Sequence, residues 1–271
     1  MQKALGLVLL LLALSGVARA ENELNCALRE AVCFHECCPN GANSTNDFVN
    51  NTIYVLSSNR ITKFADWVAY AVDAKNLNGP HNKVRNWEKD PNISDDNTLS
   101  PSDYNDAYKT YNYDRGHQAP LANFTNSDDW AKSNYLSNIT PQQKNLNRGM
   151  WMRLEIAERS LVQKYQYRNV RVITGPYYDP NEPMPNLPKS HLEHTVPSGY
   201  WKVIVIENEL KLIGVAAFKL SQNETARFYC NNTTDLATIK TITHLDVLPN
   251  LSDEDIDKTA TQQLVTDLNC G

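Results

Sequence analysis

Residues 145–165 carry the most regular pattern in the chain, and this pattern predicts a helix. Apolar side chains recur there every three or four positions, which is the spacing of one helix face. They are Leu146, Met150, Leu154, Ala157, Leu161 and Tyr165. A second stripe is spaced by four residues and consists of Asn147, Trp151, Glu155 and Arg159. The segment is therefore expected to pack one face on a core and to carry polar groups beside it.

Strand patterns surround this helix. β-branched and aromatic residues alternate in five segments. These segments are Ile53–Leu56, Phe64–Val72, Val170–Thr174, Tyr200–Ile206 and Leu210–Phe218, with a hairpin turn at residues 207–209. Residues 73–112 are polar and predict a surface excursion with one short helix, and two further helices are expected at about 234–243 and 252–268. Hairpins with interspersed helices favour an α+β fold.

The first 20 residues have the pattern of an export signal. A basic start is followed by an apolar run from Ala4 to Val17, and Ala18-Arg19-Ala20 fits the small-x-small cleavage rule. We therefore expect cleavage after Ala20, a secreted or periplasmic protein, and a single domain over residues 21–271. The later sequence has no segment long and apolar enough to span a bilayer, so no membrane association is expected.

The charge balance excludes one way of binding nucleic acid. The whole chain has a formal net charge of −5, and loss of Lys3 and Arg19 with the signal leaves 24 basic against 31 acidic residues, a charge of −7. A protein that holds nucleic acid through bulk charge would be basic. Any phosphate site must therefore be a local basic cluster on an acidic surface.

The six cysteines all lie in the expected mature chain. An even number in an exported protein indicates disulfides, and the spacing around Cys37-Cys38 suits a zinc site poorly. Cys230 and Cys270 are remote from the others and are expected to pair, which closes a loop of about 40 residues worth roughly 3–4 kcal/mol. Cys26, Cys33, Cys37 and Cys38 allow three pairings, which the sequence leaves open.

The chemistry is concentrated in Asp114-Arg115-Gly116-His117-Gln118-Ala119-Pro120. His117 can act as a general base, because the unperturbed pKa of histidine lies near neutrality. Arg115 offers a fixed charge and a forked donor for phosphate oxygens. A structural histidine is the alternative for His117. The run precedes a turn, where functional side chains gather, and its residue types indicate metal-assisted phosphodiester hydrolysis.

Asn147 lies 30 residues after His117. Its amide oxygen is a hard, neutral ligand of the kind that Mg²⁺ accepts while it keeps most of its waters. A helix N-cap is the alternative role. Glu155 is about 12 Å further along a helix axis, so it is expected to orient metal-bound water, and Arg159 to receive a neighbouring phosphate. A surface ion pair is the alternative for Glu155 and Arg159.

Several further motifs make the chain resemble the DNA/RNA non-specific endonucleases, the Serratia-nuclease family with a ββα-metal (His-Me) finger. The resemblance covers about residue 38 to Cys270. Its motifs are residues 62–70, Arg85-Asn86-Trp87, residues 114–121, 134–142 and 146–155, Thr174-Gly175-Pro176 and residues 194–203. The segments Leu24–Pro39 and Asp179–Leu192 depart from the family pattern, so the N-terminal disulfides and any dimer contact have no support from it.

The resemblance implies a role for each matching residue. His117 resembles the general base, Asn147 the direct protein ligand of Mg²⁺, and Glu155 the residue that holds the metal's water shell. The remaining implied site residues are the phosphate and transition-state arginines Arg85, Arg115 and Arg159, and the supporting and substrate-binding groups Asn134, Asn138 and Gln142. The resemblance also implies an antiparallel central sheet flanked by helices, Mn²⁺ as a substitute metal, DNA and RNA as substrates, and often a homodimer.

Two function classes compete with the enzyme. A catalytically inactive extracellular nucleic-acid-binding protein of the same fold would need neither His117 nor Asn147, and its acidic charge would be unusual. A disulfide-rich interaction protein would need more than six cysteines in about 250 residues. A secreted Mg²⁺-dependent endonuclease with little sequence specificity is therefore the function that the sequence predicts.

Overall fold

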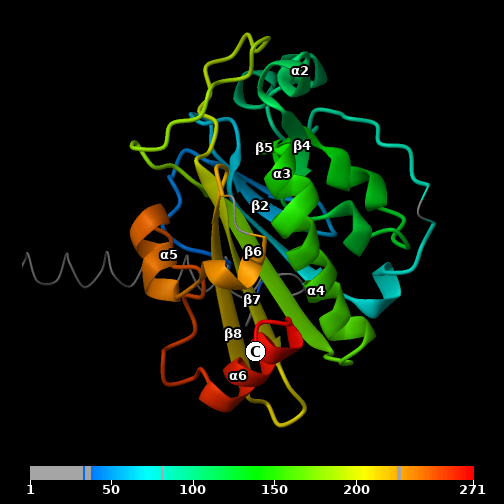
Figure 1. The fold of residues 1–271 in the computed structure, drawn as a ribbon. Helices are drawn as coiled ribbons and strands as arrows, with labels where there is room; N and C mark the ends of the chain where they lie inside the picture. Colours follow the sequence, from blue (N-terminus) through cyan, green and yellow to red (C-terminus); the bar gives the residue numbers. More distant parts are fainter. Residues whose placement is uncertain (1–32, 34–37, 81, 225–226) are drawn as a thin grey trace, which may run out of the picture.

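The centre of the fold is a twisted antiparallel sheet of seven strands (Figure 1). The computed structural model describes residues 33, 38–80, 82–224 and 227–271. The strands follow the order β1 (Asp47–Asn50), β2 (Val55–Ser58), β3 (Ala65–Val72), β6 (Asn169–Tyr177), β7 (Gly199–Glu207), β8 (Ile213–Ser221) and β9 (Thr233–Thr234). The fold is therefore the α+β class with an antiparallel sheet that the sequence predicts.

Two strands stand apart from this sheet and carry the chemistry-bearing run. β4 (Tyr113–His117) pairs antiparallel with β5 (Ile139–Gln143), with His117 opposite Ile139. Gly116 pairs with Thr140 in the register, and a Cβ on Gly116 would clash with the Gln142 side chain. Only glycine therefore allows β5 to approach β4 so closely at the residue before His117.

The helices pack on the sheet and beside the small β4–β5 pair. They are α2 (Ala107–Tyr111), α3 (Lys144–Leu146), α4 (Met152–Gln163), α5 (Leu236–Thr243) and α6 (Lys258–Asp267). Figure 1 shows α4 lying across one face of the sheet, and α6 packs against β8. The predicted apolar stripe of the α3–α4 segment faces the core, because Leu146, Met150, Leu154, Ala157 and Leu161 are all buried.

The long predicted helix is interrupted. A π-helical turn over Asn147–Trp151 separates α3 from α4, and Gly149 has non-helical backbone angles of φ −109° and ψ −110°. The prediction of one regular helix over residues 145–165 is therefore wrong. Because the turn is wider, Trp151 leaves the polar stripe and is buried against Tyr200, with ring centroids 5.6 Å apart. Wide turns of this kind are common at functional sites.

The other differences concern where elements begin. The predicted strand at 210–218 starts instead at Ile213, because Asn208–Leu212 form the loop and Leu210 is 77% exposed. The C-terminal helices start later than predicted, after Asp235 and Asp257. Each aspartate side chain accepts a backbone N–H of the first helical turn, which fixes the helix start. In the excursion at 73–112, Leu99 and Tyr104 are buried, so this segment returns to the body of the protein.

Two disulfides are present in the described residues. Cys230 pairs with Cys270, as predicted, and ties the chain end to the segment that follows β8. Cys33 pairs with Cys38, which selects among the N-terminal pairings. Cys26, Cys37 and the expected signal segment lie outside the described residues. Within the described part, no helix is long and apolar enough to cross a membrane.

Candidate active site

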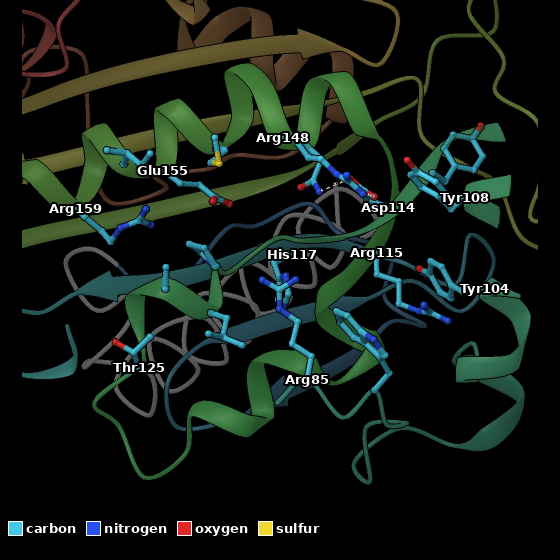
Figure 2. A pocket seen from close by; sticks show the side chains of 18 residues that line it. Arg85, Tyr104, Tyr108, Asp114, Arg115, His117, Thr125, Arg148, Glu155 and Arg159 are labelled. Atoms are coloured by element: carbon cyan, nitrogen blue, oxygen red, sulfur yellow. Dashed lines mark hydrogen bonds and ion pairs between the residues drawn. The ribbon is translucent and has the colours of Figure 1, made fainter. Parts of the chain in front are cut away.

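A cleft of about 700 Å³ is lined by α4 and the π-helical turn before it, by β4, and by the segment between β3 and β4 that includes α2 (Figure 2). Six of the side chains predicted from the sequence line it. They are Arg85, Arg115, His117, Asn147, Glu155 and Arg159. The fold thus brings together residues that are up to 74 positions apart in the chain, and it does so by setting the end of β4 beside the start of α4.

His117 sits at the end of β4, partly exposed to the cleft. Its Nε2 atom is 3.1 Å from the Asn134 Oδ1 atom, so Nε2 carries the proton and donates it. Nδ1 is then the nitrogen that can accept a proton. Burial, and secondarily the charge of Arg85, lowers the pKa of His117 to about 4, against the hydrogen bond that raises it. His117 is therefore neutral and available as a base at physiological pH.

Asn147 occupies the π-helical turn, with its amide fixed by a carboxylate on β4. The Asn147 Nδ2 atom donates to Asp114 Oδ2 at 2.9 Å, and Arg148 holds the same carboxylate through two bonds of 2.8 and 2.6 Å. Asn147 has helical angles and helix on both sides, so it is not an N-cap. With Nδ2 engaged, Oδ1 is the amide atom left to bind a cation.

The donors at this place fit a weakly held, hydrated Mg²⁺. Asn147 offers one neutral oxygen, and the Glu155 carboxylate lines the same cleft. In the described residues there is no group of three or more His, Cys, Asp or Glu side chains that could hold a metal, which excludes a zinc-type cage there. A cation that keeps most of its waters needs few protein ligands.

Glu155 lies close to a buried network of charged side chains. The pKa of Glu155 is raised to about 7, chiefly by burial and also by the charge of Glu158, against the lowering effects of Lys202 and Arg159. In this network the Glu158 carboxylate accepts a hydrogen bond from Lys202 Nζ at 2.8 Å, and both of these side chains are fully buried. Tyr70 donates to Glu158 at 3.0 Å. The network makes Glu155 a carboxyl that a nearby cation can readily keep ionised.

Arg159 is held by this network through Asn123. Asn123 is completely buried; its Nδ2 donates to Glu158 Oε1 at 2.9 Å, and its Oδ1 accepts from Arg159 Nη1 at 3.0 Å. The described residues contain no Glu155–Arg159 ion pair within 4.0 Å, so the surface-pair alternative is wrong. The remaining donors of Arg159 face the cleft that it lines.

We expect Asn123→Ala to weaken catalysis through Arg159. The change removes a hydrogen bond to a charged group, worth about 1.5–3 kcal/mol, so kcat/KM should fall about tenfold or more. The same change should cost little in an Arg159→Ala background, because the two residues act as a unit. A double-mutant cycle on cleavage rates measures this. Asn126→Ala, at an exposed asparagine of the same loop, is the control, and equal losses in both backgrounds would refute the coupling.

The other two arginines differ in how firmly they are held. Arg115 donates to the Pro101 carbonyl at 3.0 Å, and its guanidinium lies 5.5 Å from the Trp87 ring and 5.2 Å from the Tyr104 ring. Burial lowers the pKa of Arg115, but an arginine stays charged in any accessible pH range. Arg85 is exposed in the long segment between β3 and α2. The cleft therefore carries the local cationic cluster that the acidic chain requires.

Asn134, Asn138 and Gln142 lie behind the cleft and do not line it. They are 1%, 0% and 1% exposed. Asn134 holds the His117 ring, and Asn138 bonds to the Ala119 backbone through both its amide atoms. The implied substrate contacts of Asn134 and Gln142 would need exposed atoms that burial removes, so we assign these residues a supporting role instead.

Several residues of the cleft carry no prediction from the sequence. Asp114 and Arg148 are adjacent to the predicted Arg115 and Asn147, and this adjacency is the signal that could have found them. Trp87 packs 5.5 Å from the His117 ring and belongs to the Arg85-Asn86-Trp87 motif. Asn123 and Glu158 have no signal in the sequence, and Lys202 lies in the 194–203 motif, but only the fold brings these three residues together.

Comparisons with known proteins identify the family of the chain. The model of the family described as DNA/RNA non-specific endonuclease matches residues 37–254. The chain is 44% identical to a nuclease of Serratia marcescens over 69% of this chain and 68% of that protein. It is 31% identical to the mitochondrial nuclease of Saccharomyces cerevisiae, over 65% of this chain and 56% of the relative. With human mitochondrial Endonuclease G the identity is 30%, over 57% and 52%.

The fold has a matching neighbour among solved structures. A crystal structure of the EndoG/EndoGI complex aligns with a TM-score of 0.66 at 22% identity, over 79% of this chain and 90% of that one. At this identity the likeness concerns the fold. The family match spans most of the chain and includes β4, β5 and α4, the elements that build the cleft. The chain belongs to the DNA/RNA non-specific endonuclease family.

Proposed function

We propose that this protein is an endonuclease that hydrolyses the phosphodiester bonds of DNA and RNA with little sequence preference. The observation that carries the proposal is the convergence in one cleft of a neutral histidine, an amide oxygen fixed for a cation, and three arginines. Arginines that contact phosphates read the backbone, which every sequence shares. Because the net charge is −5, binding of the phosphate backbone depends on this local cluster of arginines.

In the proposed reaction His117 Nδ1 takes a proton from water as its oxygen bonds to phosphorus. Asn134 stabilises the imidazolium that forms, because its Oδ1 atom accepts the Nε2–H. The bond from phosphorus to the leaving oxygen breaks, and that oxygen takes a proton from solvent water, so each cut produces one phosphate monoester end and one hydroxyl end. Arg85, Arg115 and Arg159 donate to the phosphoryl oxygens, whose charge grows in the transition state.

The family generally uses Mg²⁺, and we propose that Asn147 Oδ1 is its direct protein ligand here. When bound, the ion would neutralise charge on the phosphoryl and leaving oxygens. Asp114 fixes the amide, and Glu155 would accept hydrogen bonds from the ion's waters. Mn²⁺ accepts the same hard oxygen donors and should substitute. Two disulfides and the N-terminal export pattern support secretion, with cleavage after Ala20.

Cleavage-site mapping tests the specificity in this proposal. End-labelled single- and double-stranded DNA and RNA of the same sequence, cut to low extent, should give products at nearly every bond. A protein that reads phosphates has no means to select one short sequence. Confinement of the cuts to one recognition sequence, or to one sugar type, would contradict the proposal.

The pH dependence should change with the concentration of Mg²⁺. Without a cation, Glu155 takes up a proton as the pH falls through about 7, which is its raised pKa. At limiting Mg²⁺ activity should therefore decline below pH 7, and at saturating Mg²⁺ the decline should move to lower pH, because a bound cation favours the carboxylate. His117, with a pKa of about 4, should not limit activity in this range. Rate–pH profiles at several Mg²⁺ concentrations measure this, and a decline that stays in place would contradict it.

A further inference from the structure

The two ends of the cleft differ in chemistry. Figure 2 shows Tyr104, Tyr108 and Arg115 at one end, Thr125 and Arg159 at the other, with His117 between them. Besides His117, the aromatic residues that line the cleft are Trp87, Tyr104, Tyr108 and Tyr113. Figure 2 shows Tyr104 and Tyr108 on the same side of the cleft as Arg115. A strand of nucleic acid whose scissile phosphate lies at His117 would therefore meet different surfaces on its two sides.

Tyr108 is the most exposed aromatic side chain that lines the cleft. Tyr104 and Tyr113 are only 4% and 2% exposed, and Trp87 packs on the His117 ring and the Arg115 guanidinium. Tyr108 is 47% exposed. An aromatic ring of this exposure has apolar area that a ligand can cover.

The backbone under Tyr108 is firmly fixed. Its helix α2 is bounded by Asp106 and Asn112, both in the left-handed conformation, and Ala107 is buried. The Asn112 carbonyl accepts the Lys144 backbone N–H at 3.0 Å, which ties α2 to the start of α3. A ring on a fixed support loses little conformational freedom when it binds a ligand.

Two cations lie over the Tyr108 ring, so a base would stack on the part of the ring that they leave exposed. The Arg148 guanidinium carbon lies 5.3 Å from the ring centroid and Lys144 Nζ lies 5.8 Å from it. Arg148 is anchored on Asp114, the residue that also fixes Asn147. Lys144 has no acidic partner within 4.0 Å among the residues that the structure describes. An exposed ring with cationic neighbours matches a nucleotide, which has an aromatic base between anionic phosphates.

We propose that Tyr108 forms a nucleobase subsite, in which the base beside the scissile phosphate stacks on the ring while Lys144 and Arg148 attract the adjoining phosphate. The proposal rests on the proposed function and adds a preference to it. Stacking is indifferent to base identity, because every base has a flat aromatic face. In a duplex the bases already stack on each other, so the subsite favours single-stranded DNA and RNA.

An abasic substitution in the substrate tests the subsite. A single-stranded, end-labelled DNA oligonucleotide carrying one abasic position is cut to low extent by the parent protein with Mg²⁺. Cleavage at the bond that places the abasic position at Tyr108 should be about 5- to 100-fold weaker than in the intact oligonucleotide, as is typical of the loss of one stacked base. The bonds further along the same strand serve as the internal reference.

The Tyr108→Ala variant should lose this position-dependent suppression, and its kcat/KM on intact single strands should be lower by the same factor. Its cleavage of duplex DNA should fall by a clearly smaller factor, because a paired base does not reach the ring. Tyr108→Phe keeps the flat ring and should behave like the parent. Tyr111→Ala, on the same helix but outside the cleft, should keep the suppression and so controls for loosening of α2.

The outcomes separate this inference from the proposed function. Equal suppression in the parent and in Tyr108→Ala, or equal losses on single strands and duplex, would overturn the subsite and leave the endonuclease in place. Suppression in the parent that disappears in Tyr111→Ala as well would also overturn it. A parent protein that cuts none of the oligonucleotides would refute the proposed function itself.

Discussion

His117→Ala is expected to lower the rate of DNA and RNA cleavage by at least about 10²–10⁴-fold, the usual cost of losing a general base. The reason is geometric: Asn134 engages Nε2 and leaves Nδ1 as the one proton acceptor of this ring. Single-turnover cleavage of a labelled substrate at saturating Mg²⁺ measures the effect on the chemical step.

His191→Ala is a matched control, because His191 is exposed in the loop before β7 and lies outside the cleft. It should cleave at the parent rate. If His117→Ala keeps a rate within about tenfold of the parent, another group takes the proton and the assignment of His117 is wrong.

The second large effect is expected for Asn147→Ala. Removal of an outer-shell partner of a metal site typically costs 10- to 100-fold, so removal of the one proposed protein ligand should cost at least about 100-fold. The Mg²⁺ concentration for half-maximal activity should also rise. Titration of activity with Mg²⁺ for the parent, Asn147→Ala and the exposed neighbour Asn145→Ala measures both effects.

Replacement of Asn147 by aspartate, a charged ligand, should not preserve activity. In Asn147→Asp, the atom that replaces Nδ2 would be a carboxylate oxygen about 2.9 Å from Asp114 Oδ2, where the amide now donates a hydrogen bond. Repulsion between the two carboxylates should turn the side chain away or raise its pKa. Full activity of Asn147→Asp, or of Asn147→Ala at parent Mg²⁺ concentrations, would contradict the proposed role of the Asp114–Asn147 bond.

The sequence predicts the fold where side-chain periodicity reports burial directly. The buried stripe on α4 and strands β3, β6 and β7 are such cases, because their apolar residues face one core. Periodicity is uninformative about local backbone geometry. The π-helical turn depends on the angles of Gly149, and the delayed start of β8 depends on a five-residue loop in which an exposed leucine looked like part of a strand.

The residues of the site likewise fall into those that the sequence predicts and those that only the fold reveals. Residues whose types are unusual for their position, such as Arg115 beside His117, could be predicted because a motif brings them together. The groups that hold them could not. Asn123 joins Arg159 to Glu158 across 35 residues of sequence, and Tyr70 and Lys202 reach the same carboxylate from β3 and β7. Such contacts are set by three-dimensional packing, and a single sequence carries no pattern that reports them.

The most direct test of a metal-dependent hydrolase at this cleft is nicking of supercoiled plasmid DNA, run in parallel on an RNA of mixed sequence. The parent and His117→Ala proteins are purified identically and assayed with Mg²⁺, with EDTA, and with EDTA followed by excess Mg²⁺. We expect cleavage of both substrates by the parent with Mg²⁺, its loss in EDTA, its return with excess Mg²⁺, and at least a hundredfold weaker cleavage by His117→Ala. Undiminished cleavage in EDTA, or binding of both nucleic acids without cleavage under any of these conditions, would contradict it.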